Sequence, residues 1–596
     1  MKKSITHLAF SAFIFLFSFQ KSDENSWIRI NQLGYKQAAT KVAVFATKKH
    51  DHPGIKKWSL VDARSGKSIK TFKTVAAFGN YGPFTKVCRL NFSEITQPGE
   101  YFIEAAGIRS PVFRINNAAY NGTADFALQY MRQQRCGYNP YLKDSCHLKD
   151  GYTIYGPMHD GTRVDATGGW HDATDYLQYS TTSANATYHL LAAYRDFPSV
   201  FEDNHKKNGL DGKSDTPDVL DEAEWGLQWL LKMHPKEEWL FNQIADDRDH
   251  AGMRLPAMDS VDYGWGKGNG RPVYFASGEV QGLGKYKNRA TGTSSVAGKF
   301  SSAFALASLV YKDLDPSLSK TFSEKSVSAY NYGLKKPGVQ QTAPNKAPYF
   351  YEEDNWVDDM ELAAAVLFQK SGDNDFLNQA MDFGRKETVT PWLAADTARH
   401  YQWYPFHNFG HYEIAKSADE KIRAEFISYY KQGIEKVWQK ANKNGFYRGV
   451  PFIWCSNNLT ASFAIQCYLY RKLSGDNSYL ELEQASIDWL LGVNPWGTSM
   501  ISGLPEKGDS PVDPHSSLTH LYNYPTTGGL VDGPVSGYIF NSLRGVTLSE
   551  PDEYAAFQSM LAVYHDDFSD YSSNEPTMDG TASLVYLLAA IESDKF

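Results

Sequence analysis

The segments Ser371-Gly372-Asp373-Asn374-Asp375-Phe376-Leu377 and Ser474-Gly475-Asp476-Asn477-Ser478-Tyr479-Leu480 repeat one pattern at a distance of 103 residues. Each segment follows an apolar run with helical spacing. Each offers a Gly that can end that helix and an Asp or Asn that can cap the next one. Two such helix–turn–helix units predict a repeated architecture of α-hairpins.

Helical spacing of apolar residues continues from about residue 118 to the C-terminus. In 218–233, for example, Val219, Ala223, Leu227 and Leu230 share one face. The same spacing predicts helices at 183–194, 300–310, 357–368, 459–473, 482–491 and 581–591. Helix pairs over 118–596 suit a closed ring of hairpins, and the long loops 246–292 and 500–550 would build a site on one rim. We therefore expect a mainly α fold.

The section from 25 to 116 has a different pattern. Short β-rich segments are separated by turn clusters such as Ser65-Gly66 and Gln97-Pro98-Gly99, which predicts a small all-β sandwich. The predicted strands are 27–31, 41–45, 58–62, 86–92, 101–104 and 111–115. No cluster of catalytic residue types occurs there, so we expect this domain to pack against the helical part.

Composition narrows the classes of function. The chain has 60 Lys+Arg, 68 Asp+Glu and a formal net charge of −8, which argues against a nucleic-acid partner because phosphate binding needs a basic surface. Five cysteines in 596 residues exclude a disulfide scaffold. Aromatic residues make up 14% of the chain. Many of them will be core, but such an excess also suits surfaces that stack on sugar rings.

The first 21 residues have the features of a secretory signal peptide. Lys2 and Lys3 precede an apolar run at 8–19, which is too short to span a bilayer. We expect an exported protein, periplasmic or secreted, with a buried first helix as the alternative. No other stretch is long and apolar enough to predict a membrane span.

Two acidic motifs are candidates for catalysis. Asp172 and Asp175 are three residues apart between two aromatic residues, Trp170 and Tyr176, so they could share one water or one sugar hydroxyl. Glu575 precedes a Pro just before the predicted helix 581–591. Either motif could instead be a helix cap. A pair of carboxyl groups is what glycoside hydrolysis needs, one as the acid and one to activate water.

Cys136, Cys146, His147 and His171 form a possible metal site. Two thiolates and two imidazoles can complete a tetrahedral zinc site with no open position. A disulfide between Cys136 and Cys146 is the alternative in an exported protein. Because His171 adjoins Asp172, a metal there would anchor the acidic loop.

Taken together, these segments resemble glycoside hydrolase family 9, in its subgroup with an N-terminal immunoglobulin-like domain. The stretch 28–35 resembles the start of that β domain, 169–175 the water-activating loop, and 570–575 the general-acid segment. Further matches lie at 217–223, 351–362, 490–495 and 529–534. The resemblance implies an (α/α)6 toroid over 118–596 behind an immunoglobulin-like sandwich over 25–116. It also implies hydrolysis of β-1,4-glucosidic bonds with inversion.

The resemblance also assigns roles to residues. It implies that Asp175 is the general base, that Asp172 helps to hold the water and that Glu575 is the general acid. The residues expected to contact the substrate are His250, His515 and Trp170.

The cofactors that the resemblance implies are metals. The family pattern matches a structural zinc on Cys136, Cys146, His147 and His171, and calcium near Asp358 and Asp359. No motif indicates an organic cofactor. We expect a monomer whose partner is a β-glucan, such as a cellulose-like polymer, mixed-linkage glucan, xyloglucan or their oligosaccharides.

The sequence departs from the family pattern at two places, of which the first concerns the water pocket and the second the expected substrate. Thr174 stands where the family commonly has Gly. The segment 513–517 has His515 but lacks the His and Arg that usually follow it. We therefore expect a preference shifted from crystalline cellulose toward soluble or branched β-glucans. A weakly active or non-catalytic glycan-binding protein on the same fold is the alternative.

Overall fold

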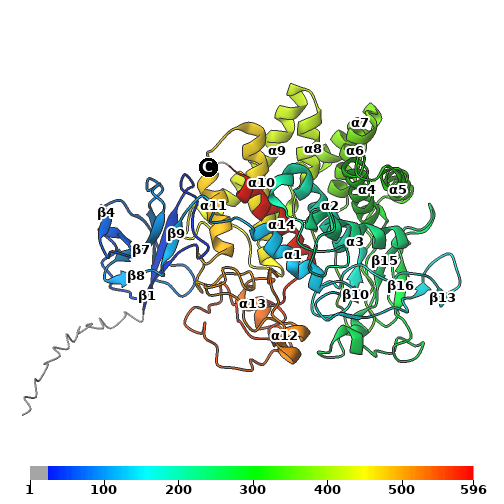
Figure 1. Cartoon of the computed structure of the whole chain (residues 1–596), viewed down its shortest axis with the longest axis horizontal. Coiled ribbons are helices and arrows are strands. Elements are labelled where there is room, and N and C mark those ends of the chain that lie inside the picture. The colour runs from blue at the N-terminus through cyan, green and yellow to red at the C-terminus, as the bar shows by residue number, and fades with distance from the viewer. Residues whose placement is uncertain (1–24, 595–596) are drawn as a thin grey trace, which may run out of the picture.

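The computed structural model describes residues 25–594, with a β domain at one end and helices filling the rest (Figure 1). The predicted signal segment 1–21 lies outside the described residues. Within 25–594, no helix combines the length and the apolar character that a membrane crossing requires.

The β domain is the predicted sandwich. Its two sheets have the strand orders β1-β2-β6-β5 and β4-β3-β7-β8, and β9 pairs with β7. Phe45, Trp58, Leu60 and Ile103 belong to one buried cluster between the sheets. The strands are β1 (Ser26–Arg29), β2 (Val42–Thr47), β3 (Trp58–Asp62), β4 (Ser68–Phe72), β5 (Ala76–Phe78), β6 (Lys86–Asn91), β7 (Gly99–Ala105), β8 (Ile108–Arg109) and β9 (Phe113–Ile115).

The helical part closes into a ring of inner helices. Successive inner helices contact one another around the whole ring, and α14 contacts both α10 and α2. The described inner helices are α2 (Ser180–Asp196), α4 (Ser294–Val310), α6 (Val357–Ser371), α8 (Phe409–Ser417), α10 (Ser456–Ser474) and α14 (Met578–Ser593). Their apolar residues are buried on almost every face, which explains the long apolar runs in the sequence.

Each inner helix packs against one outer helix, which completes the (α/α)6 architecture within the described residues. The outer helices are α1 (Thr123–Gln133), α3 (Asp218–Met233), α5 (Pro316–Lys335), α7 (Asn374–Lys386), α9 (Glu420–Ala441) and α11 (Leu480–Leu490). Two short helices, α12 (Ser517–Tyr522) and α13 (Gly537–Phe540), lie in the loop before α14. The 3-10 turns are η1 (Pro198–Val200), η2 (Asp247–Asp249), η3 (Pro256–Met258) and η4 (Pro391–Ala394).

The repeated turn works as predicted in one copy and differently in the other. Gly372 and Gly475 both end a helix in the left-handed region, each with φ 71°. Asp373 caps α7 by accepting the backbone N–H of Asp375. In the second copy Asp476 instead accepts from Ser478, and α11 starts later behind Tyr479 without a side-chain cap.

A five-stranded sheet, which the sequence patterns did not predict, stands beside the ring. Its strand order is β13-β12-β16-β15-β14, and every strand has at most four residues. Its strands are β12 (Tyr152–Ile154), β13 (Thr162–Arg163), β14 (Gln178–Tyr179), β15 (Phe241–Ile244) and β16 (Pro272–Phe275), and a separate pair is β10 (Tyr138–Asn139) with β11 (Asp144–Ser145). Because β14 pairs with β15, the loop before β14 lies next to the loop after β15.

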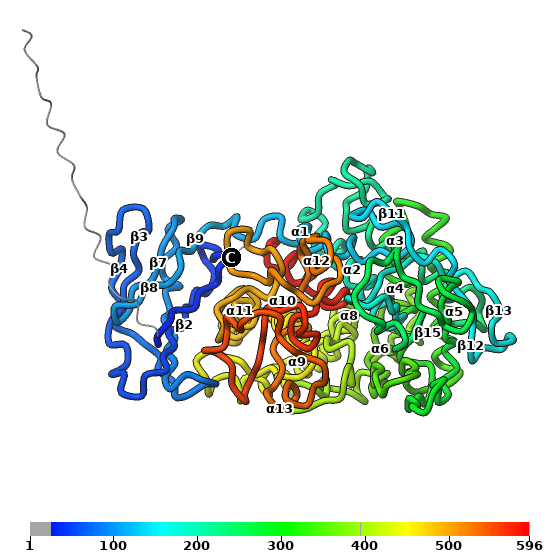
Figure 2. The backbone as a smooth tube through the Cα atoms, turned by 90° about the horizontal axis from the view of Figure 1, so that it is seen from below, coloured from blue at the N-terminus to red at the C-terminus, as the bar shows by residue number. Residues whose placement is uncertain are grey.

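The β domain is joined to the ring by buried polar and apolar contacts. Asn31 donates to the carboxylate of Asp488 at 2.7 Å and to the hydroxyl of Tyr120 at 2.9 Å. Leu33 and Val87 of the β domain belong to the same apolar cluster as the ring helices. Seen from below, the strands again lie beside α11, where this junction forms (Figure 2).

Candidate active site and metal-ligand cluster

The loop that carries Asp172 and Asp175 is irregular, so the alternative of a capped helix start is wrong. Gly169 has φ 74°, and a Cβ there would lie 2.7 Å from the ring of Trp229, so the turn requires glycine. Backbone bonds then fix the loop: His171 donates to the carbonyl of Gln134 at 2.8 Å, and Asp172 to that of Leu177 at 2.9 Å.

Glu575 faces this loop. The backbone N–H of Thr174 donates to Oε1 of Glu575 at 3.0 Å. The carbonyl of Glu575 accepts from the N–H of Asp532 at 2.8 Å. Burial, together with the negative charges of Asp175 and Asp532, raises the pKa of Glu575 well above its usual value. The structure therefore brings Glu575 against the loop that carries Asp175 and favours the protonated form of Glu575.

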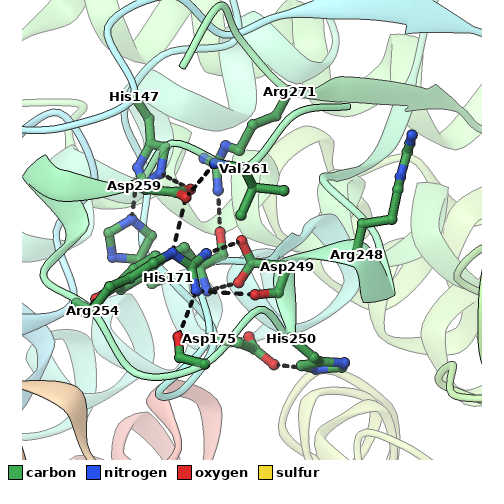
Figure 3. Close-up of polar contacts among 12 residues, drawn as sticks. His147, His171, Asp175, Arg248, Asp249, His250, Arg254, Asp259, Val261 and Arg271 are labelled. Carbon is green, nitrogen blue, oxygen red and sulfur yellow. Dashed lines mark hydrogen bonds and ion pairs between the residues drawn. The ribbon is translucent and has the colours of Figure 1, made fainter. Parts of the chain in front are cut away.

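Asp175 is the more open of the two loop aspartates. Its side chain is 19% exposed, and Oδ2 lies 2.9 Å from Nε2 of His250 (Figure 3). Loss of water around the imidazole opposes protonation, but the hydrogen bond and charge of Asp175 outweigh this and raise the pKa of His250. His250, which was predicted to contact the substrate, thus also orients Asp175.

Asp172 is more enclosed than Asp175 and is only 3% exposed. Its Oδ1 accepts from the hydroxyl of Thr182 at 2.6 Å, and its Oδ2 accepts from the hydroxyl of Tyr351. Burial is the larger cause, and the negative charge of the nearby Asp579 the next, of a pKa of Asp172 well above its usual value. Tyr351 in turn stacks on Tyr401 with the ring centres 3.9 Å apart. Asp172 is therefore held rigidly under the loop.

His515 borders the same site. Its N–H donates to the carbonyl of Asn574 at 3.0 Å, and its carbonyl accepts from the hydroxyl of Thr174. The side chain of Thr174, which departs from the family pattern, therefore ties the aspartate loop to the His515 segment. Ser516 and Ser517 occupy the two positions after His515 where the family usually has His and Arg.

A chain of rings extends along the wall of the site from His250 to His515. Successive ring centres are 5.1, 5.3, 5.2, 6.1 and 6.2 Å apart. The rings between the two histidines are Tyr349, His400, Trp454 and Tyr571. Such a wall suits the apolar faces of sugar rings. Sequence reasoning missed these four residues because they come from separate segments that share no local motif.

The prediction that Trp170 contacts the substrate is wrong. Its side chain has no exposed surface, and its indole N–H donates to Oε1 of Glu222 at 2.7 Å. A Cβ on Gly226 would lie 2.3 Å from its ring. Trp170 therefore packs behind the loop against α3 and supports Asp172 from the core.

Cys136, Cys146, His147 and His171 do come together, with one ligand atom from each lying within 4.8 Å of all the others. Both cysteines are free thiols, so the structure contradicts the alternative disulfide. The separations are 3.6 Å for Cys136 Sγ to His147 Nδ1, 3.8 Å for Cys146 Sγ to His171 Nε2, and 3.3 Å for His147 Nδ1 to His171 Nε2. Tetrahedral zinc, with bonds of about 2.3 Å to sulfur and about 2.0–2.1 Å to nitrogen, separates its ligands by about 3.3–3.8 Å. The four residues therefore fit zinc.

A hydrogen-bonded relay connects this cluster to the aspartate loop (Figure 3). Nε2 of His147 lies 3.0 Å from Asp259, and Arg254 bridges Asp259 and Asp249 at 2.9 and 2.7 Å. Asp249 accepts the backbone N–H of Tyr176 at 2.6 Å. Outer partners of this kind orient metal ligands, and here they also hold the residue after Asp175.

Asp359, where the family resemblance implied calcium, is paired with a lysine instead. Nζ of Lys299 lies 2.7 Å from Oδ2 of Asp359 and also contacts Oε1 of Glu353, so an ammonium already provides the positive charge. Both side-chain oxygens of Asp358 are buried without a hydrogen-bond partner. Among the described residues, the Cys–His cluster is the one group with the ligand arrangement of a metal site.

Comparison with known proteins decides the family. The model of Glycosyl hydrolase family 9 matches residues 120–588, and that of the Cellulase N-terminal ig-like domain matches residues 23–110. The chain belongs to glycosyl hydrolase family 9. It is therefore a glycoside hydrolase, as the sequence indicated, and its immunoglobulin-like domain and helical ring are those expected for the subgroup.

Two relatives match over almost their full lengths. The chain is similar to a cellodextrinase of Butyrivibrio fibrisolvens, with 25% identity over 95% of this chain and 99% of the relative. It is also similar to a xyloglucan-specific endo-beta-1,4-glucanase of Bacteroides ovatus, with 23% identity over 96% and 94%. A solved metagenome-derived glycoside hydrolase family 9 endoglucanase superposes with a TM-score of 0.74 at 25% identity, covering 96% of this chain and 99% of that one.

Proposed function

We propose that the family 9 chain hydrolyses β-1,4-glucosidic bonds in β-glucans by inversion, with Asp175 as base and Glu575 as acid. The observation that supports this proposal most strongly is the hydrogen bond from the Thr174 N–H to Glu575, which joins Glu575 to the loop that carries Asp175 while the two carboxyl groups keep unlike environments. One is enclosed with a raised pKa, and the other is partly open beside His250. Glycoside hydrolysis uses such a division of roles.

Each residue then has a distinct part in the single displacement. Asp175, oriented by His250, removes a proton from a water that attacks the anomeric carbon from the face opposite the leaving group. Glu575 protonates the departing oxygen at the same time. Asp172 was predicted to help hold the water, but Thr182 and Tyr351 bind both of its oxygens, so we propose instead that it supports the loop that carries Asp175. The ring wall would stack on the sugars.

The first product formed reveals the stereochemistry. We expect NMR of an early digest of cellotetraose to show the α-anomer at the new reducing end, because one displacement inverts a β-linkage. Asp175→Asn under the same conditions serves as the inactive reference. A β-anomer appearing first would mean retention and would make these roles wrong.

A panel of glucans tests the substrate class. We expect higher turnover on soluble mixed-linkage glucan, xyloglucan or short oligomers than on crystalline cellulose, since Ser516 and Ser517 stand where the family usually has His and Arg. Reducing-sugar release under matched conditions measures the ranking. Crystalline cellulose ranking above every soluble glucan would contradict it. Binding to glucans without any turnover would instead favour the alternative glycan-binding function.

Location, metal and assembly belong to the same proposal. We propose that the protein is exported to the periplasm or out of the cell, because Lys2 and Lys3 precede the apolar run 8–19. A structural zinc would be held by the Cys–His cluster and would supply rigidity, since four protein ligands leave no position for a reacting water. We propose a monomer.

A further inference from the structure

Lys299 occupies the place in which sequence resemblance suggested calcium. Its side chain is 3% exposed, and it belongs to α4 next to Gly298. A Cβ on Gly298 would lie 2.8 Å from the backbone of Asp359, so α4 and α6 touch at this point. This close approach brings the Lys299 ammonium to within 2.7 Å of Asp359.

The surroundings of the ammonium are strongly acidic. Lys299 contacts Asp359 and Glu353, and Asp358 stands next to Asp359 with both oxygens buried and unpartnered. A cavity of about 10 Å³, the space of about one water, lies against Lys299, Asp358 and Asn408. Burial opposes the charge of Lys299, but Asp359 and Glu353 outweigh it and raise the pKa of the ammonium. Asp359 and Glu353 thus have a permanent positive partner.

The neighbours of Glu353 connect this ion pair to the active site. Glu353 also accepts from the hydroxyl of Thr181 at 3.3 Å, next to Thr182, which binds Asp172. Two residues before Glu353, Tyr351 donates its hydroxyl to Asp172. Both supports of Asp172 therefore start from the segments that the Lys299 ion pair holds together.

We infer that the Lys299 ammonium acts as a built-in cation in place of calcium and, through Glu353, positions Tyr351 against Asp172. Lys299 is a positioning residue, because it touches Glu353 and Asp359 and acts on Asp172 only through them. A divalent cation would have to enter beside an ammonium that the same carboxylates already bind, and like charges at this distance repel strongly in a buried site. The inference goes beyond the proposed function, and its stability measurements do not depend on the substrate.

Calcium titration gives the first test. Protein dialysed into metal-free buffer without chelator is scanned for Tm in increasing CaCl2, with MgCl2 as reference, for the wild type and for Asp358→Asn. We expect the Tm of the wild type to be the same in CaCl2 and MgCl2. A rise specific to CaCl2 that Asp358→Asn removes would overturn the inference, because it would show calcium binding at Asp358 with Lys299 present.

A double-mutant cycle gives the second test. Lys299→Met keeps the length of the side chain and removes its charge, so we expect a lower Tm and a kcat about 10- to 100-fold lower, with KM little changed, since displaced catalytic supports cost about that much. Asp359→Asn is measured alone and combined with Lys299→Met, which closes the cycle. The double variant should regain part of the Tm and of kcat lost in Lys299→Met, because one unpaired buried charge is then removed.

Strictly additive effects in that cycle, or a Lys299→Met variant with wild-type Tm and kcat, would refute the positioning role. If Lys299→Met does not fold, the calcium titration on the wild type and Asp358→Asn still decides whether the site takes a metal ion. A wild type without glucanase activity would contradict the proposed function only. The role of Lys299 would still be tested by the Tm values of the cycle, which need no substrate.

Discussion

Glu575→Gln is expected to lower kcat on a soluble β-glucan by about 10²- to 10⁴-fold, the usual contribution of a general acid. The amide retains the shape of the side chain and can still meet the N–H of Thr174 through its oxygen, but it has no proton to give to the leaving oxygen. Initial rates of reducing-sugar release measure the loss. Asp175→Asn should cost a similar factor, because the attacking water then loses its base.

The pH profile gives the same prediction an independent readout. The active form has Glu575 protonated, so the wild-type rate should fall as pH rises through the raised pKa of this residue. That same raised pKa means that the fold loses stability as pH rises above the usual carboxyl range, since the ionised form is disfavoured by burial. Glu575→Gln removes this penalty, and its Tm near neutral pH should equal or exceed that of the wild type.

Glu324→Gln on α5 is the matched control, because its side chain is 69% exposed on the outer layer of the ring. This variant should keep both the rate and the pH profile. Glu575→Gln retaining the wild-type rate, or keeping the same fall in rate at high pH, would show that another group donates the proton.

Most inner helices could be predicted from sequence because they are buried nearly all round. Helix α10 was predicted at 459–473 and occupies Ser456–Ser474, whereas the short inner helix α8 was not predicted. Outer helices are harder to recognise, although α3 was predicted at its observed bounds. In α9 the buried residues, such as Phe426, Tyr430 and Ile434, form one narrow stripe, and Lys and Glu on the other faces dilute the apolar pattern. The short strands β12 to β16 have too few residues to show any alternation.

The candidate site divides in the same way. Asp172, Asp175 and Glu575 lie in short motifs, so their residue types and spacing could be recognised in one stretch of chain. The partners that set their protonation and orientation come from other loops, as with Tyr351 under Asp172 and Lys299 beside Asp359. Trp170 shows the opposite limit. Its place next to the aspartate motif suggested contact with sugar, whereas its burial depends on Gly226, which lies 56 residues later in the sequence on α3.

Removal of one ligand from the Cys–His cluster is expected to have the second large effect. Cys146→Ala should lose the zinc that we propose, lower Tm strongly and reduce kcat, whereas the wild type should contain one zinc per chain by elemental analysis. Structural zinc sites contribute roughly 10–16 kcal/mol of apparent binding energy in small domains at pH 7. Because this fold is much larger, the protein can lose part of that binding energy and still remain folded. Cys467→Ala, which removes the same atom from a buried thiol on α10, is the matched control.

The loss of activity should follow from the relay behind the cluster. Without a metal, His147 loses its fixed orientation toward Asp259, and Arg254 and Asp249 then hold the N–H of Tyr176 less firmly. Asp259→Asn should therefore weaken zinc binding by about 10- to 100-fold, as outer partners of metal ligands usually do. It should also reduce kcat more than it changes KM, because it acts on the loop that carries Asp175. Wild-type protein without zinc, with Cys136 and Cys146 joined as a disulfide, would show instead that a covalent bond anchors this loop.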